Sequence, residues 1–273
     1  MSDAVKQHYA RAGLGEAILA ALTRAGKNTE RIELDDLAPL DEFHLRGRAA
    51  TLDLARAAGL RADQEVLDVG SGIGGPSLRI ARDFGCRVTG VDLSEDYCRV
   101  ATLLAERSGL AARCSYVAAN ALALPCADAA FDVGWSQHAA MNIADKPRLY
   151  REMNRVLRPG GVLALYDVLA EAGGPAILPA PWARSAETSF LVAPQELRRQ
   201  LEAAGFAIAD WHDDSEAVRA WFAARAARVA PAEPLALGVQ LLLGAEFAVM
   251  ARNQLRNLAE RRIAVVRIIG RKR

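Results

Sequence analysis

Hydrophobic positions follow two different periods along this chain, and the period changes near residue 60. Before that point apolar side chains recur at helical spacing, as at Leu14, Ile18 and Leu22. From residue 65 to about residue 167 short apolar runs alternate with amphipathic segments. The runs predict strands at 65–69, 87–91, 115–118, 131–135 and 162–166, and the segments between them predict helices at 77–84, 95–108 and 146–157.

The remaining third of the chain begins with a stretch rich in glycine and proline, residues 168–194, which predicts a loop. After it we expect a helix at 195–204, a strand at 206–211, two helices between 215 and 262, and a closing strand at 263–269. Strands that alternate with helices indicate an α/β fold with a doubly wound, Rossmann-like, mostly parallel sheet. We divide the chain into an N-terminal helical cap (1–60), a core (61–214 and 262–273) and a C-terminal helical lid insertion (215–261).

Composition and charge exclude several classes of protein. The chain is 52% hydrophobic and 25% charged, which is typical of a globular protein. Its 34 basic and 33 acidic residues leave a net charge of +1, without the basic excess expected of a nucleic-acid partner. The longest apolar stretch, residues 236–250, is too short to span a membrane and contains Glu246. We therefore expect a cytoplasmic protein with neither a nucleic-acid nor a membrane partner.

The four cysteines lie twelve or more residues apart, without the paired spacing of a metal site or a disulfide framework. We therefore predict no bound metal.

A glycine-rich segment, VLDVGSGIGG at residues 66–75, carries the strongest local signal. It joins the first predicted strand to a helix that opens with Pro76. Glycines at such a turn allow backbone N–H groups to approach a ligand at the start of the helix. Read as Gly70-x-Gly72-x-x-Gly75, the segment also matches the dinucleotide fingerprint, so an NAD-dependent oxidoreductase is a distant alternative.

Three polar residues at the ends of predicted strands narrow the ligand. Asp68 would repel a pyrophosphate but would suit a cationic amino-acid group, and Asp92 can hold both hydroxyls of a ribose. Asn120 can pair with an adenine edge. Together they point to S-adenosylmethionine. Two simpler interpretations stay open: Asp92 as a cap of the following helix, and Asn120 as an ordinary turn residue.

Four segments in order resemble the motifs of class I S-adenosylmethionine-dependent methyltransferases of the methyltransferase-11 type. They are VLDVGSGIGG, VTGVDLS, ANALALP with CADAAFDVGWSQHA, and NRVLRPGGVLALYD. The resemblance implies S-adenosylmethionine as cofactor and S-adenosylhomocysteine as product. It assigns the methionine portion to Asp68, Gly70 and Gly72, the ribose to Asp92, and the adenine to Leu93, Asn120 and Ala121. Ser71, Ser136 and Gln137 complete the predicted set. Position 120 departs from the family pattern, which usually has aspartate there.

The segment SQHAAMNIADK followed by YDVL is similar to glycine, sarcosine and dimethylglycine N-methyltransferases. The resemblance favours a small-molecule acceptor, with an amine of the glycine or sarcosine type as the leading candidate. The alternative is C- or O-methylation of a quinone, prenyl or phenolic molecule, which apolar lid helices would suit. The Asn/Asp-Pro-Pro-Tyr signature of enzymes that methylate nucleic-acid bases is missing. The oligomeric state, a homodimer included, stays open.

Candidate catalytic residues are His138, His44 and Asn142. The relatives usually have histidine at position 142, so a base cannot be carried over there, and His138 lies one helical turn earlier. It can act as a base, contact a ligand or be structural. Candidate substrate-binding residues are Asp41, Arg46, Tyr9, Trp182 and Asn253, for which a solvated loop, a surface position, lid packing or a solvated helix face is the simpler explanation.

Overall fold

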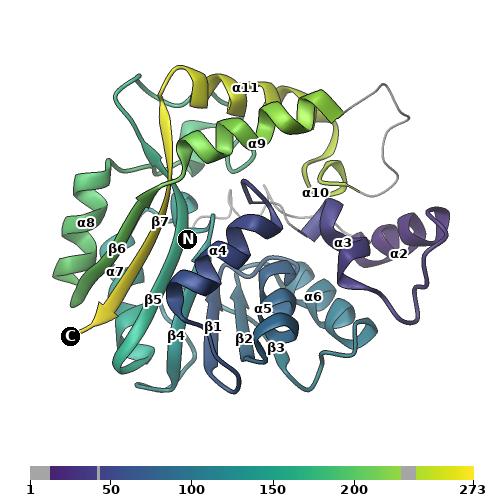
Figure 1. Ribbon diagram of the computed structural model, residues 1–273, viewed down its shortest axis with the longest axis horizontal. Helices are drawn as coiled ribbons and strands as arrows, with labels where there is room; N and C mark the ends of the chain where they lie inside the picture. The colour runs from purple at the N-terminus through teal and green to yellow at the C-terminus, as the bar shows by residue number, and fades with distance from the viewer. Residues whose placement is uncertain (1–12, 42–43, 229–237) are drawn as a thin grey trace.

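The centre of the protein is a seven-stranded sheet with the strand order β3-β2-β1-β4-β5-β7-β6 (Figure 1). The computed structural model describes residues 13–41, 44–228 and 238–273. The strands are β1 (Glu65–Val69), β2 (Arg87–Asp92), β3 (Cys114–Ala118), β4 (Phe131–Gln137), β5 (Leu157–Ala170), β6 (Phe206–Asp213) and β7 (Ile263–Lys272). All pairs among β1 to β5 are parallel, and β7 runs antiparallel to both of its neighbours. The predicted doubly wound, mostly parallel α/β sheet is confirmed.

Helices cover both faces of this sheet. They are α2 (Leu14–Arg24), α3 (Leu34–Asp41), α4 (Arg48–Ala58), α5 (Gly75–Phe84), α6 (Glu95–Arg107), α7 (Lys146–Val156), α8 (Pro194–Ala203), α9 (Ser215–Arg228), α10 (Gln240–Leu243) and α11 (Phe247–Ala259). Three short 3₁₀ turns, η1 (Ala140–Asn142), η2 (Ala186–Thr188) and η3 (Gly244–Glu246), complete the described elements.

Strand β5 shows how the two faces are separated. Successive side chains of a strand point to opposite faces, so Ala164 and Tyr166 join the hydrophobic cluster built with α2 to α6. Leu163 and Leu165 instead join the cluster built with α7 and α8. The alternation in the sequence therefore distributes one strand over two hydrophobic cores, and Tyr166 lies on the face that α4 covers.

Helix starts lie at the carboxyl edge of the parallel strands, and local side chains fix them there. The Ser94 hydroxyl accepts a hydrogen bond from the N–H of Tyr97 at the start of α6. The Asp145 carboxylate accepts one from the N–H of Arg148 at the start of α7. Such caps satisfy N–H groups that the first helical turn leaves without partners. The loops between strand and helix therefore gather at one edge of the sheet, where a ligand site is expected.

Three predicted boundaries are wrong in two neighbouring strands, β5 and β7. Strand β5 extends beyond the predicted 162–166 in both directions and takes the first three residues of the predicted loop 168–194. Its partner β7 also continues past residue 269. The later ends of both strands come from mutual pairing, because the antiparallel register runs without interruption from Val162 opposite Arg271 to Ala170 opposite Ile263. At its start β5 pairs with β4, where Leu157 lies opposite Phe131.

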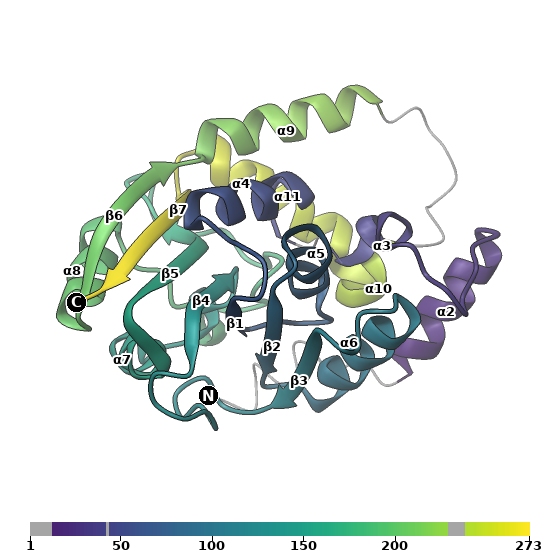
Figure 2. The ribbon, with the colours of Figure 1, turned by 60° about the horizontal axis from the view of Figure 1, so that its bottom comes forward.

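The connection between β6 and β7 holds α9, α10, η3 and α11, within the segment predicted as a lid. Helices α9 and α11 lie side by side in both views (Figures 1 and 2), and α10 packs against α2. No helix in the described part of the chain is long and apolar enough to cross a membrane.

Candidate active site

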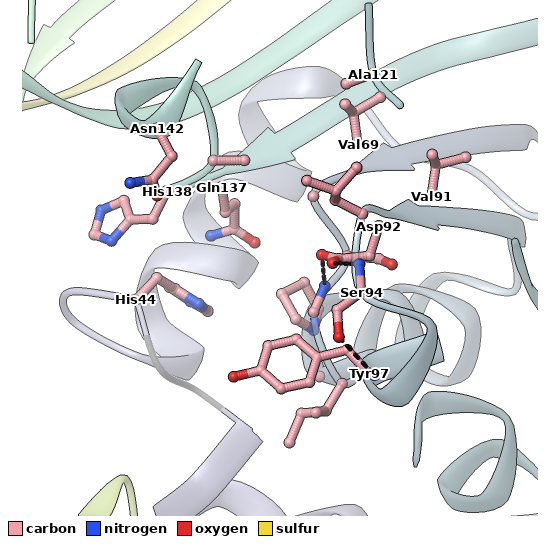
Figure 3. A pocket seen from close by; sticks show the side chains of 18 of the residues that line it. His44, Val69, Val91, Asp92, Ser94, Tyr97, Ala121, Gln137, His138 and Asn142 are labelled. Carbon is pink, nitrogen blue, oxygen red and sulfur yellow. Dashed lines mark hydrogen bonds between the residues drawn. The ribbon is translucent and has the colours of Figure 1, made fainter. Parts of the chain in front are cut away.

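A cavity opens at the carboxyl ends of β1, β2 and β4 (Figure 3), with an empty volume of about 1040 Å³ that includes its open mouth. We call its two sides the cofactor end and the acceptor end. The cofactor end is lined by Gly70, Ser71, Gly72, Asp92, Leu93 and Ala121, and the acceptor end by His44, Gln137, His138, Asn142, Ile143 and Leu242.

The glycine loop after β1 lines the cavity, and at Gly70 it has no room for a larger residue. Gly70 has a φ of 80°, and a Cβ atom added to it would come within 2.3 Å of the Cβ of Ala139. The N–H of Gly70 donates to the carbonyl of Val91 over 2.7 Å, which ties the loop to the end of β2. The predicted loop is therefore a tight connection with its backbone exposed to the cavity.

Asp92 at the end of β2 organises the same end of the cavity. Its carboxylate accepts hydrogen bonds from the N–H groups of Gly72 and Ser94, both over 2.9 Å. Burial raises its pKa, and these two backbone donors oppose the rise. A carboxylate has about four acceptor positions, so Asp92 keeps acceptor capacity for a ligand hydroxyl beside its backbone donors. Asp92 thus contacts the cavity and also fulfils the structural role that the sequence left open.

Asp68 belongs to β1, just before the glycine loop. Its side chain is buried and accepts a hydrogen bond of 2.6 Å from the Ser77 hydroxyl of α5. Burial raises the pKa of Asp68 to about 7, and the charge of Asp92 adds to the shift. Asp68 does not line the cavity. Its predicted direct contact with a methionine portion therefore has no support in this structure.

The side-chain amide of Gln137 has a fixed orientation. Its Oε1 accepts hydrogen bonds from Trp135 Nε1 over 3.1 Å and from the Thr51 hydroxyl over 3.2 Å. An indole nitrogen can only donate, so the amide oxygen must face Trp135 and the amide nitrogen must point the other way. Nε2 of Gln137 is buried at the cavity and has no hydrogen-bond partner among the described residues. It is therefore a donor that awaits a ligand acceptor.

His138 stands at the acceptor end and is stacked on Tyr166 of β5, with ring centroids 5.3 Å apart and planes 6° from parallel. Its backbone has a φ of 50°, which is rare for a residue other than glycine and is held by the N–H of His138 donating to the Tyr166 carbonyl. Burial lowers its pKa well below the ordinary value. Its Nε2 is buried without a partner in the described structure. This ring is neutral at neutral pH and presents an unused nitrogen.

His44, from the loop before α4, closes the other side of the acceptor end (Figure 3). Its ring lies edge-on to His138, at a centroid distance of 6.2 Å and an angle of 88°. Nε2 lies 2.9 Å from the carbonyl of Gly47 and 3.0 Å from the Thr51 hydroxyl. Since a carbonyl can only accept, Nε2 carries the proton. Burial lowers the pKa of His44 to about 4.

The loop after β4 owes its shape to Lys146, which the sequence reasoning missed. Its buried Nζ donates to the carbonyls of Ala140 and Ile143, over 2.7 and 2.9 Å. Asn142 is held in the same turn by donating to the carbonyls of Trp182 and Thr188. The only signal in the sequence was the rarity of lysine in an arginine-rich chain, and this signal says nothing about position. Thr51 and Leu242, also missed, gave no signal at all.

Two residues predicted to bind the cofactor have structural partners instead. Oδ1 of Asn120 accepts from the N–H of Leu122 over 2.9 Å, which is the simple turn interpretation, and its neighbour Ala121 lines the cavity in its place. The Ser136 hydroxyl is buried and donates to the carbonyl of Val69. Neither Asn120 nor Ser136 lines the cavity.

Three predicted substrate-binding residues, Arg46, Trp182 and Asn253, are not part of the described cavity lining. Arg46 forms ion pairs with Asp53 and Asp214. Trp182 is buried and donates to the Ser189 hydroxyl, and Asn253 donates to the carbonyl of Pro179. Asp41 is the last residue of α3, but its side chain and the whole of Tyr9 lie outside the described residues. Within the described ranges no group of three potential ligands could hold a metal ion.

A family model described as a methyltransferase domain matches residues 67–165, which run from β1 through most of β5. The chain carries a methyltransferase domain. The predicted resemblance to the S-adenosylmethionine-dependent methyltransferases is thereby confirmed, and S-adenosylmethionine is the cofactor of this domain. The matched residues include the glycine loop, Asp92 and His138, and so most of the cavity.

Known proteins agree with this assignment. Methyltransferase GfsG of Streptomyces halstedii is 37% identical over 134 residues, which are 49% of this chain and 48% of that protein. O-methyltransferase resE of Aspergillus sclerotiorum is 34% identical over 178 residues, 62% of this chain and 66% of that protein. The chain thus spans about half to two thirds of these curated relatives. The solved structure of the [4+2]-cyclase SpnF is similar to this protein, with a TM-score of 0.70 and 26% sequence identity. The match covers 98% of this chain and 94% of the SpnF chain.

The cavity fits this cofactor. Gly70, Ser71 and Gly72 of the loop line it, and at Gly70 a Cβ atom would collide with Ala139. Asp92 offers acceptor positions suited to ribose hydroxyls, while the buried Ser71 hydroxyl and Gln137 amide lack partners in the described structure. The methyltransferase domain therefore presents a donor-and-acceptor set that matches a nucleoside with an amino-acid tail.

Proposed function

We propose that this protein is an S-adenosylmethionine-dependent methyltransferase that methylates a hydroxyl oxygen of a small molecule. The observation that carries the proposal is Nε2 of His138, which is buried at the acceptor end without a partner in the described structure. A hydroxyl acceptor must lose its proton during methyl transfer, and a positioned neutral imidazole can take it. A neutral amine acceptor needs no such base.

In this proposal the cofactor lies along the glycine loop. Asp92 holds the ribose hydroxyls, and the Gln137 amide donates to the carboxylate of the methionine portion. When bound, S-adenosylmethionine supplies an electrophilic methyl group. The protein orients the acceptor oxygen toward that methyl group and excludes water. Tyr166 supports the His138 ring from behind, so that Nε2 faces the acceptor and accepts its proton as the new bond forms.

The two hypotheses from the sequence, an amine acceptor and C- or O-methylation, differ in the class of acceptor. The glycine or sarcosine type of amine remains untested. The hydroxyl alternative is supported by the unused imidazole nitrogen and by resE, a relative described as an O-methyltransferase. C-methylation also needs a proton acceptor and is the nearest variant of this proposal.

The first test is calorimetric titration with S-adenosylmethionine, S-adenosylhomocysteine and NAD. We expect both adenosyl ligands to bind in the micromolar range and NAD not to bind. Incubation with S-adenosylmethionine and a panel of phenols, alcohols and primary or secondary amines should then give S-adenosylhomocysteine together with a product that has gained one methyl group on oxygen. A product methylated only on nitrogen would contradict the proposal, and binding of NAD alone would overturn the cofactor assignment.

A second function is favoured by one comparison. The structure that covers nearly all of this chain belongs to a protein described as a [4+2]-cyclase, and a shared fold can support unrelated reactions. In that case the acceptor would be rearranged at unchanged mass and no S-adenosylhomocysteine would accumulate. The same incubation, followed by mass spectrometry of the small molecule, distinguishes the two reactions.

A further inference from the structure

The acceptor end differs from the rest of the cavity in its charge. Its described lining consists of two imidazoles, two amides and the aliphatic side chains of Ile143 and Leu242. The one carboxylate among the described lining residues, Asp92, belongs to the cofactor end, and these residues include no lysine or arginine. An acceptor that carried a carboxylate or a phosphate would therefore meet no counter-ion among the described lining residues, and the proposed binding mode already gives the Gln137 amide to the cofactor.

Two cations close in sequence to the residues of this end, Arg46 and Lys146, are already bound by other groups of the protein. The Arg46 guanidinium is bound by Asp53 at 2.7 Å and by Asp214 at 2.9 Å, and the Asp214 side chain is only 4% exposed. The Lys146 ammonium is buried and donates to two carbonyls beneath the loop. Moving either group into the cavity would leave buried partners without their hydrogen bonds, which costs several kcal/mol.

The two imidazoles do not replace these cations. His44 donates from Nε2 to the carbonyl of Gly47 and packs between Thr51 and the ring of His138. The His44 side chain is buried and that of His138 is partly buried, and burial lowers the pKa of each, that of His44 to about 4. At neutral pH they can bind a polar group by hydrogen bonding, but they offer no net charge.

A metal ion could also neutralise a phosphorylated acceptor. No cluster of three histidine, cysteine, aspartate or glutamate side chains suited to a metal exists within residues 13–41, 44–228 and 238–273. The charge of a diphosphate would thus remain unbalanced in this lining, and an isolated charge moved out of water is strongly unfavourable.

We infer that the acceptor is an uncharged molecule, with an apolar body against Ile143 and Leu242 and a hydroxyl at His138, and that the site rejects zwitterionic and phosphorylated acceptors. This inference rests on the proposed function and narrows its substrate class. We assign Leu242 of α10 as the specificity-determining residue, because its aliphatic side chain belongs to the cavity lining.

The experiment measures binding to the full-length protein saturated with S-adenosylhomocysteine. Three probes are used: 1-naphthol as a neutral hydroxyl compound, sarcosine as a zwitterion, and phosphoethanolamine as a phosphate ester. We expect 1-naphthol to bind and the other two to show no binding. Leu242→Arg should weaken 1-naphthol by about tenfold or more, which corresponds to about 1.4 kcal/mol, and should give phosphoethanolamine measurable affinity. Leu242→Met is the matched control and should behave like the wild type.

The outcomes separate the two levels of the proposal. If S-adenosylhomocysteine binds but sarcosine or phosphoethanolamine binds more tightly than 1-naphthol, or if 1-naphthol does not bind, the inference of an uncharged acceptor is wrong and the cofactor assignment stands. Failure of the wild type to bind S-adenosylhomocysteine overturns the proposed function and this inference together. Each variant is compared at equal S-adenosylhomocysteine occupancy, so a folding defect is recognised by its loss.

Discussion

The two ends of the cavity are built in different ways. Most of the cofactor end comes from two short segments, residues 69–76 and 91–94, each at the end of its own strand. The acceptor end joins His44 from the loop before α4, residues 137–143 after β4, and Leu242 from α10. Backbone groups and one carboxylate dominate the first, whereas side chains held by distant partners dominate the second. Local spacing thus builds the end that we propose for the cofactor, and the folded chain builds the end that we propose for the acceptor.

The largest effect on the acceptor end is expected from His138→Gln, which keeps a polar side chain but removes the base. We expect kcat to fall by about 10²- to 10⁴-fold, the range typical of general-base catalysis, with the Kd of S-adenosylhomocysteine unchanged. Because burial lowers the pKa of His138, the wild-type rate should stay flat as the pH falls through about 6.5, where an ordinary histidine would become protonated. Steady-state kinetics and titration measure both quantities.

His212→Gln is the control for His138, since this histidine is 55% exposed and pairs with Asp214 away from the cavity. Equal losses of kcat in the two variants would show that His138 has no special part in the reaction.

Lys146→Met tests whether a buried cation shapes the acceptor end from below. It removes two hydrogen bonds from a charged donor, each of which contributes about 1.5 to 3 kcal/mol. We expect the free energy of unfolding to fall by about 3 kcal/mol and the affinity for 1-naphthol to fall with it, while S-adenosylhomocysteine still binds. Denaturant unfolding and titration supply these values.

Lys272→Met is a closely matched control for Lys146. Lys272 also donates to two carbonyls, those of Asn154 and Leu157, but it lies in β7 outside the cavity lining. It should cost similar stability without changing the affinity for 1-naphthol. If both variants weakened 1-naphthol equally, Lys146 would have no local effect on the site.

Asp92→Ala should break the cofactor end alone. It removes the acceptor of the Gly72 and Ser94 N–H groups together with the proposed ribose contacts. We expect the Kd of S-adenosylhomocysteine to rise by about 100-fold, since each hydrogen bond to a charged group contributes about 1.5 to 3 kcal/mol. Asp96→Ala, four residues later and paired with Arg99 on α6, should leave the Kd unchanged. An Asp92→Ala protein that bound as tightly as the Asp96→Ala protein would refute the role of Asp92.

Asp68→Asn should have the smallest effect, which appears in how the free energy of unfolding depends on pH. The pKa of Asp68 is raised to about 7 in the folded protein, against an ordinary value of 3.8. A group of this kind favours folding below pH 4, and this contribution is lost as the pH rises through 7. Asparagine does not titrate, so the variant should gain stability relative to the wild type by up to about 1.4 kcal/mol per pH unit. Thermal unfolding at pH 5 and pH 8 tests the sign, and a difference that shrinks toward pH 8 would contradict it.

The sheet was predictable because its strands and helices carry their signals within a few residues. The strand at 65–69 was predicted at both ends, and the helices after it differed by at most two residues from α5, α6 and α7. The length of β5 was not predictable, because its last residues are ordered by β7, about a hundred residues later. A strand next to another strand extends as far as their hydrogen bonds continue.

The candidate site likewise contains residues that local sequence predicts and residues whose role depends on distant partners. The glycine loop and Asp92 were found from the sequence because tight turns and strand ends restrict which residues fit there. Which polar side chains stay available for a ligand was decided by the tertiary structure alone. Arg46 has the right chemistry, but Asp53 and Asp214 bind its guanidinium. The amide of Gln137, by contrast, is turned toward the cavity because Trp135 and Thr51 hold its oxygen. A side chain's chemistry is written in the sequence, but its free hydrogen-bonding capacity depends on partners that only folding brings within reach.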